Sequence, residues 1–112
     1  MSNTLKLYYW DYDMDGGIAS DKPEQTTLTD ALQYMEELSE TDGNFLGFEL
    51  ADGKIIQFMH DENLGLLLDI PDIEEGGSYT KTLDLDACLQ IIRDLYNGKK
   101  PMDIEGLSFD SY

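Results

Sequence analysis

Three short apolar segments between residues 45 and 70 constrain the fold of this chain more than any other feature. Phe45–Leu50 and Lys54–His60 each alternate between apolar and other side chains, and Leu64–Ile70 contains three consecutive leucines. Alternation with a period of two is typical of a strand that buries one face, whereas a continuous apolar run suits a central strand buried on both faces. The segments therefore predict an antiparallel β-sheet meander.

Turn-forming residues separate these segments. Asp52-Gly53 suits the two positive-φ positions of a tight hairpin, and Asp61–Asn63 predicts the next turn. Pro71 has no N–H to donate, so we expect it to end the third strand. Gly76-Gly77 predicts a turn before a fourth strand over Ser78–Leu83.

The chain before and after the meander predicts further elements. Thr4–Trp10 has the alternation and the aromatic residues of a strand, and Asp11–Gln25 is expected to be a polar loop. The tail carries Ile104, Leu107 and Phe109, which predict a short closing strand or a strap.

Two helices are predicted from apolar stripes with capping residues. Thr27 begins a run similar to a capping box, and Asp84 can cap a second helix that ends near Gly98. The apolar stripes at helical spacing are Leu28, Ala31, Leu32, Met35 and Leu38 in the first helix, and Leu85, Cys88, Leu89, Ile92, Leu95 and Tyr96 in the second. The sequence thus predicts one α+β domain over residues 1–112, an antiparallel β-sheet meander with two α-helices packed on one face.

The formal net charge is −17, from 24 acidic and 7 basic residues. Such a charge opposes direct binding to nucleic acid or to an anionic membrane, because their phosphates require lysine and arginine. It favours a basic protein partner, although a solvated acidic surface is the simpler alternative. No apolar run approaches the length of a membrane span, so we expect a cytoplasmic protein.

Acidic residues are concentrated where basic ones are missing. Between Ile55 and Thr80 the chain has six acidic residues and no lysine or arginine. Apolar residues within such a region could anchor a partner while the carboxylates steer it. The predicted partner-binding residues are Asp61, Glu62, Asp69, Asp72, Ile73, Glu74, Glu75 and Tyr79.

A second candidate site is the segment that starts at Asp11. Asp11, Asp13 and Asp15 followed by Gly16 reproduce the start of a calcium-binding loop. Lys22 stands at the twelfth position, where such a loop needs a bidentate glutamate. We therefore expect no metal site there, and a solvated acidic turn is the preferred interpretation.

No catalytic constellation is predicted. His60 is the only histidine and has no serine or cysteine in a nucleophile motif to activate. Cys88 is the only cysteine and lies on the apolar stripe of the second helix, so we expect a buried thiol. The sequence predicts a protein that is not an enzyme and carries no cofactor.

The order of segments resembles a known family. The resemblance rests on the Asn44-Phe45 strand entry, on LGLLLDIPDIEEGGSY and on LDLDACLQIIRDLYNGKKPMDIEGLSF. Together these are similar to the type-one immunity family of bacterial polymorphic-toxin systems, whose partners include nucleic-acid deaminase toxins. The resemblance implies an immunity protein that binds a cognate toxin with a basic surface and occludes its active site. That toxin would act on nucleic acid, as a deaminase or a nuclease does.

Two other classes of function stay open. An acidic mimic of nucleic acid would block some other basic protein. A calcium-binding module would use the three aspartates of residues 11–15.

Overall fold

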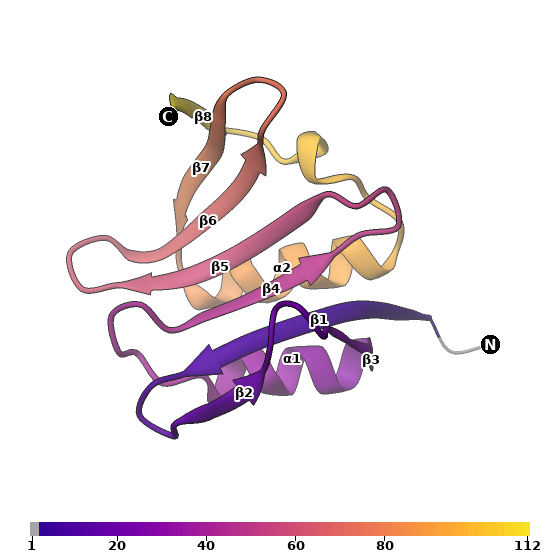
Figure 1. Ribbon diagram of the computed structural model, residues 1–112, viewed down its shortest axis with the longest axis vertical. Coiled ribbons are helices and arrows are strands. Elements are labelled where there is room, and N and C mark those ends of the chain that lie inside the picture. The colour runs from indigo at the N-terminus through magenta and orange to yellow at the C-terminus, as the bar shows by residue number, and fades with distance from the viewer. Residues whose placement is uncertain (1–2) are drawn as a thin grey trace.

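The computed structural model describes residues 3–112 and confirms the predicted α+β class (Figure 1). Its centre is an eight-stranded antiparallel sheet in the order β2-β1-β4-β5-β6-β7-β8, with β3 also paired to β1. The strands are β1 (Thr4–Asp11), β2 (Gly16–Ile18), β3 (Glu24–Thr27), β4 (Phe45–Glu49), β5 (Ile55–Asp61), β6 (Gly65–Asp72), β7 (Gly77–Leu83) and β8 (Ser108–Ser111). The helices are α1 (Leu28–Glu37), α2 (Leu85–Tyr96) and the short 3-10 helix η1 (Pro101–Asp103).

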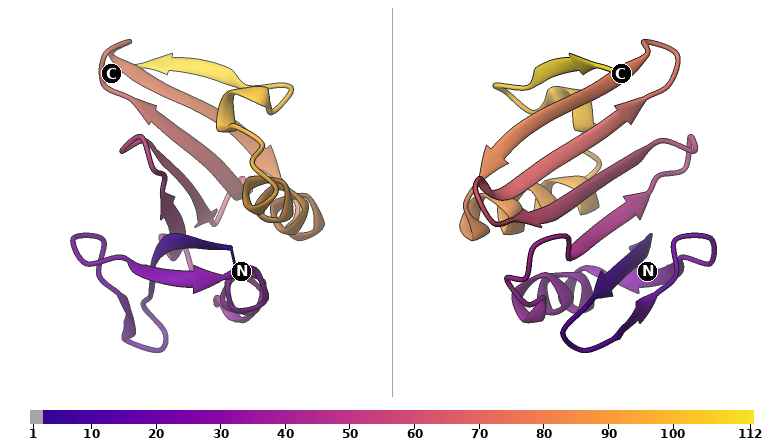
Figure 2. Two further views of the ribbon diagram at one scale, coloured as in Figure 1. Left: turned by 90° about the vertical axis from the view of Figure 1, so that its right-hand side faces the viewer. Right: turned by 60° about the vertical axis from the view of Figure 1, so that its left-hand side comes forward.

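Both α-helices pack on one face of the sheet (Figure 2). The side chains of the core alternate along the strands, as the sequence pattern predicted. The core comprises Leu7, Leu46, Phe48, Ile56, Phe58, Leu66, Leu68 and Ile70 from the sheet, with Ala31, Met35, Leu38, Cys88, Leu89, Ile92, Leu95 and Tyr96 from the helices and their ends. Among residues 3–112, no helix is both long enough and apolar enough to cross a membrane.

The helix ends confirm the predicted caps. The side chain of Thr27 accepts a hydrogen bond from the N–H of Asp30, and that of Asp84 accepts one from Ala87 at 2.8 Å. Each cap satisfies an N–H group that has no partner inside the helix. Gly98 follows α2 with φ +90°, a conformation that costs glycine little.

The segment Asp11–Gln25 was wrongly predicted to be all loop. Here β1 continues to Asp11, and β2 and β3 pair with the same edge of β1, leaving residues 19–23 as a loop between them. These strands lack apolar alternation, so their pairing is set by the neighbouring strand. Gly17 is required in β2, because a Cβ atom would lie 2.0 Å from the carbonyl oxygen of Tyr9.

Two turn predictions need correction. The first hairpin has a three-residue loop, in which Gly53 donates to Leu50 O at 2.9 Å and Leu50 donates to Lys54 O at 2.8 Å. Only Gly53 has positive φ, at +82°, so the loop follows the three-residue pattern with one left-handed glycine. Pro71 does not end β6 but pairs with Ser78, beyond the last paired residue of β5, where a missing donor is tolerated.

The central strand β6 is buried on one face only. Leu66 and Leu68 are buried against the helices, whereas Leu67 between them is half-buried. The prediction of burial on both faces was therefore wrong, because both helices lie on the same side of the sheet.

Candidate functional site

The sheet has one face that neither α-helix covers, which we call the front face. Strand pairing arranges its side chains in two rows that cross the sheet. The polar row runs through Tyr8, Gly47, Gln57, Asp69 and Thr80. The apolar row runs through Trp10, Phe45, Met59 and Leu67, all of them half-buried.

Hydrogen bonds fix the polar row. The hydroxyl of Tyr8 donates to Gln57 Oε1 at 3.0 Å, and Gln57 Nε2 donates to Asp69 Oδ2 at 2.9 Å. Burial, and then the carboxylates of Asp69 and Glu49, raise the pKa of Tyr8 to about 12. The phenol therefore stays protonated at neutral pH, and the chain of hydrogen bonds holds the Asp69 carboxylate in place.

Gly47 makes this arrangement possible. The ring of Tyr8 lies over β4, and a Cβ atom on Gly47 would approach that ring to 2.3 Å. The ring also meets the edge of Phe45, with a centroid distance of 6.1 Å. The two rows are therefore packed together by Tyr8 and Phe45.

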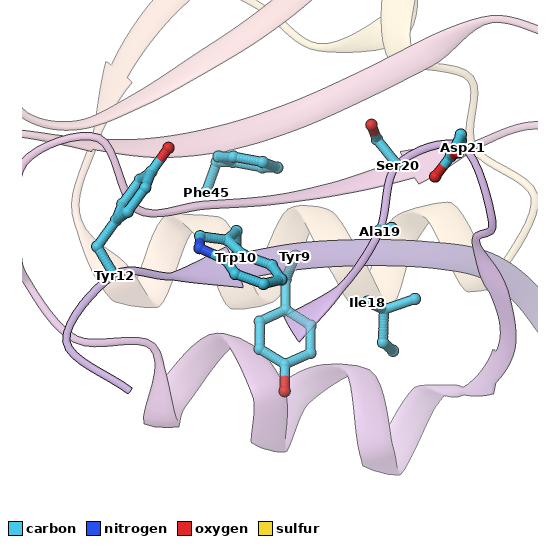
Figure 3. Close-up of a pocket in the computed structure, with 8 residues that line it drawn as sticks. All are labelled: Tyr9, Trp10, Tyr12, Ile18, Ala19, Ser20, Asp21 and Phe45. Atoms are coloured by element: carbon cyan, nitrogen blue, oxygen red, sulfur yellow. The ribbon is translucent and has the colours of Figure 1, made fainter. Parts of the chain in front are cut away.

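The apolar row ends in a hollow of about 280 Å³, which we call the aromatic hollow (Figure 3). Trp10, Tyr12 and Phe45 form one side, and loop residues 19–21 form the other. Figure 3 shows these side chains above β1, whereas Tyr9 points to the opposite side, toward α1. The hollow therefore belongs to the front face.

A buried carboxylate stabilises the backbone beside this hollow. Asp11 is 3% exposed, and its Oδ2 accepts hydrogen bonds from the N–H and hydroxyl of Ser39 at 2.9 and 2.8 Å. Its Oδ1 accepts from Asn44 Nδ2 at 3.1 Å and from the N–H groups of Asp13 and Met14. Burial alone would raise the pKa of Asp11, but the hydrogen bonds outweigh it and lower the pKa below its ordinary value.

Asn44 connects this buried cluster to the aromatic hollow. Its Oδ1 accepts a hydrogen bond from the N–H of Tyr12 at 2.8 Å, and its neighbour in the chain is Phe45. Two aromatic walls of the hollow are thereby tied to one fully buried side chain.

The same contacts bear on the calcium alternative. Both carboxylate oxygens of Asp11 already accept hydrogen bonds from the protein, and the Asp13 carboxylate accepts one from the Thr41 hydroxyl. Asp11 could serve as a cation ligand only by giving up these bonds. Among residues 3–112, no group of three histidine, cysteine, aspartate or glutamate side chains is arranged to hold a metal ion.

The predicted partner-binding residues are distributed over separate parts of the sheet. Residues 73–76 form the turn between β6 and β7. We call this turn, together with Asp72 at the end of β6, the acidic turn, and its Ile73 is 86% exposed. Asp61 and Glu62 lie at the other end of β6, roughly 24 Å away for a strand of this length. Asp69 lies between the two ends, on the front face.

Tyr79 points to the face that carries the helices. It pairs with buried Ile70 and contacts the ring of Phe109 in β8, with a centroid distance of 5.0 Å. Its half-buried ring thus packs β8 against β7 and is not displayed beside Asp69.

His60 and Cys88 lie in structural surroundings. Burial lowers the pKa of His60, opposed by the carboxylates of Glu40 and Asp11, so the imidazole is neutral at pH 7. Burial raises the pKa of Cys88 to about 12, so this fully buried group stays a thiol. Neither side chain is paired with a nucleophile or base by a hydrogen bond in the described part of the chain.

Sequence reasoning did not predict the aromatic hollow. One signal was available in the run Tyr8-Tyr9-Trp10, since aromatic residues at successive strand positions must point to both faces. The opposite wall was unpredictable, because residues 19–21 meet Phe45 only through the pairing of β2 and β4 on either side of β1.

Comparison of the chain with protein-family models, curated proteins and solved structures gave no match.

Proposed function

We propose that this protein is a stoichiometric inhibitor of the immunity type. It binds a basic, nucleic-acid-acting toxin in the bacterial cytoplasm and occludes the toxin's active site without turnover. The observation that carries this proposal is the uncovered front face, where aromatic side chains are flanked by carboxylates on a chain of net charge −17.

The charge of the molecule supports a basic partner. Within residues 3–112 the structure has one ion pair, between Lys99 and Asp94 at 4.0 Å. Most carboxylates are therefore not neutralised by a neighbouring cation and contribute to a long-range negative field. A toxin that acts on nucleic acid needs a basic groove for its substrate, so the same field would speed association and compete with that substrate.

The front face supports binding by a few anchoring residues. Interfaces gain most of their affinity from buried aromatic and apolar groups, which carboxylates at the rim supplement with orientation and rate. Trp10, Phe45 and Tyr12 provide the aromatic groups, and Asp69 lies in the neighbouring polar row. The acidic turn can steer the partner from the edge of this face.

The sequence resemblance to the type-one immunity family adds the identity of the partner class to this proposal. Tight binding is needed for such a role, because free toxin is lethal to the cell that makes it. A nanomolar dissociation constant corresponds to about −12 kcal/mol.

The test is co-expression with the toxin encoded beside this protein, followed by titration of the purified pair. We expect survival of the cells, a stable complex, and inhibition that saturates at an equimolar ratio. Inhibition by far less than one equivalent would instead indicate an enzyme. The absence of any complex would refute the immunity proposal.

The same titration with two variants distinguishes an interface anchored by aromatic groups from a mimic of nucleic acid. Phe45→Ala removes an aromatic group of the front face, whereas Glu74→Gln with Glu75→Gln removes two charges from the acidic turn. An anchored interface loses more affinity in the first variant. A purely electrostatic mimic loses more in the second.

A further inference from the structure

We propose that the aromatic hollow binds an arginine side chain presented by the basic partner. This inference deepens the proposed function and rests on it for the nature of the partner.

The size of the hollow suits one side chain. Its volume of about 280 Å³ lies just below the roughly 300–1,000 Å³ of sites that enclose a small molecule. The hollow is open on the front face, so a side chain projecting from a docked protein can enter it (Figure 3).

The walls of the hollow favour a planar cation. Trp10, Tyr12 and Phe45 present aromatic surfaces, and Asp21 lies across from them in the loop. A guanidinium group stacks on aromatic rings and forms forked hydrogen bonds with a carboxylate. The ammonium group of lysine is more strongly hydrated and lacks the planar shape, so arginine fits this combination better.

The hollow is held in place before a partner arrives. Asn44 ties the backbone N–H of Tyr12 to the Asp11 cluster, and the loop opposite closes through a hydrogen bond from Lys22 N to Ala19 O at 3.0 Å. Little ordering of the backbone is then needed on binding, which limits its entropic cost.

A second hollow on the molecule provides a contrast. It has a volume of about 320 Å³ and lies beside the first residues of β1. Lys6 and Glu49 are both among its lining residues, which include no aromatic side chain. A guanidinium group has no ring to stack on there, so size alone does not make a hollow an arginine site.

The test uses Trp10, which is the only tryptophan of the chain and therefore reports on this site by fluorescence. The probes are peptides of six arginines, six lysines and six citrullines, titrated at low salt into the full-length protein. We expect the arginine peptide to change the fluorescence of Trp10 and to bind about fivefold more tightly than the lysine peptide. The citrulline peptide, which has no charge, should not bind measurably.

Matched variants separate the hollow from general electrostatics. Tyr12→Ala and Asp21→Asn should each weaken the arginine peptide about fivefold. Their controls are Tyr112→Ala, which removes a remote exposed tyrosine, and Asp86→Asn, which removes one exposed charge from α2 on the opposite face of the sheet. Tyr112→Ala and Asp86→Asn should change affinity less than about twofold, and Lys22→Gln beside Asp21 should tighten binding.

Three outcomes would overturn the inference. These are equal affinity for arginine and lysine peptides, equal losses in the test and control variants, and binding detected by calorimetry without a change at Trp10. The proposed function fails separately, in the toxin titration. Peptide binding at Trp10 with no equimolar toxin inhibition would refute the function alone, whereas equimolar inhibition without these peptide effects would refute the hollow alone.

Discussion

At the scale of single residues, the side chain of Asp11 is buried and accepts several hydrogen bonds. One buried carboxylate accepts hydrogen bonds from the turn after β1, from Ser39 after α1 and from Asn44 before β4. These segments are far apart in sequence, so the charge of Asp11 joins parts of the chain that local structure does not connect. The aromatic hollow depends on the same cluster through Asn44.

We predict that Asp11→Asn lowers the free energy of unfolding at pH 7 by about 2 kcal/mol, measured by urea denaturation. The amide retains one acceptor oxygen and directs an NH₂ group toward donors, so buried donors lose their partner. Asp86→Asn is the control, since Asp86 is an exposed residue of α2 with the same change of charge. An equal loss in both variants would contradict the buried role.

The effect of Asp11→Asn should also depend on pH. The folded-state pKa of Asp11 is lowered, so its contribution is present above the unfolded-state pKa of about 4 and is lost as pH falls through the folded value. The difference in stability between wild type and Asp11→Asn should therefore narrow below about pH 4. A difference that stays constant down to the acid transition would contradict this linkage.

Gly47 permits the packing of the front face. We predict that Gly47→Ala lowers the free energy of unfolding by about 1–3 kcal/mol, because its Cβ would meet the ring of Tyr8 at 2.3 Å. Displacing that ring also breaks the hydrogen bond to Gln57. Gly16→Ala is the control, since its nearest atom is Met14 O at 3.8 Å, and it should change stability by less than about 1 kcal/mol.

At the scale of elements, the ends of α2 illustrate how local chemistry sets a boundary. We predict that Asp84→Ala lowers the free energy of unfolding by about 1 kcal/mol, because the N–H of Ala87 loses its acceptor. Asp84→Asn keeps an acceptor and should be nearly neutral. If the two variants lost equal stability, the charge of Asp84 would matter and its hydrogen bond would not.

The short strands β2 and β3 show the opposite case, because pairing with a neighbouring strand sets them. Their neighbour is β1, which pairs with β4 along one edge and with β2 and β3 along the other. Neither short strand has the alternating apolar pattern that predicts a strand by itself. The break between them leaves the loop 19–23, which supplies one wall of the aromatic hollow.

At the scale of the whole molecule, charge repulsion opposes the folded state. We predict that raising sodium chloride from about 10 to 200 mM increases the melting temperature measured by circular dichroism, because screening weakens repulsion among unpaired carboxylates. The net charge of −17 makes this effect larger than the loss of a single ion pair.

A neutral osmolyte at matched osmolality is the control for this measurement, since it does not screen charge. A melting temperature that falls with added salt would show that ion pairs dominate over repulsion, and one that stays level would contradict the predicted increase. Lys54→Glu, an exposed substitution that adds negative charge, should steepen the salt dependence.

The sequence alone determined the parts of this protein that depend on local periodicity and backbone chemistry. Alternation between Phe45 and Ile70 predicted the meander, and Thr27, Asp84 and Gly98 predicted helix ends that the structure confirms. These features follow from interactions within a few residues, which is why a single sequence contains them. The acidic charge and the burial of Cys88 were likewise evident from composition and pattern.

Only the tertiary structure decided how distant residues meet. It left the row from Trp10 to Leu67 uncovered and separated Asp61 from the acidic turn. It also turned Tyr79 away from Asp69 and buried Asp11 among three segments. The physical reason is that strand pairing and the choice of face are non-local, because each depends on partners tens of residues away that local propensity does not encode.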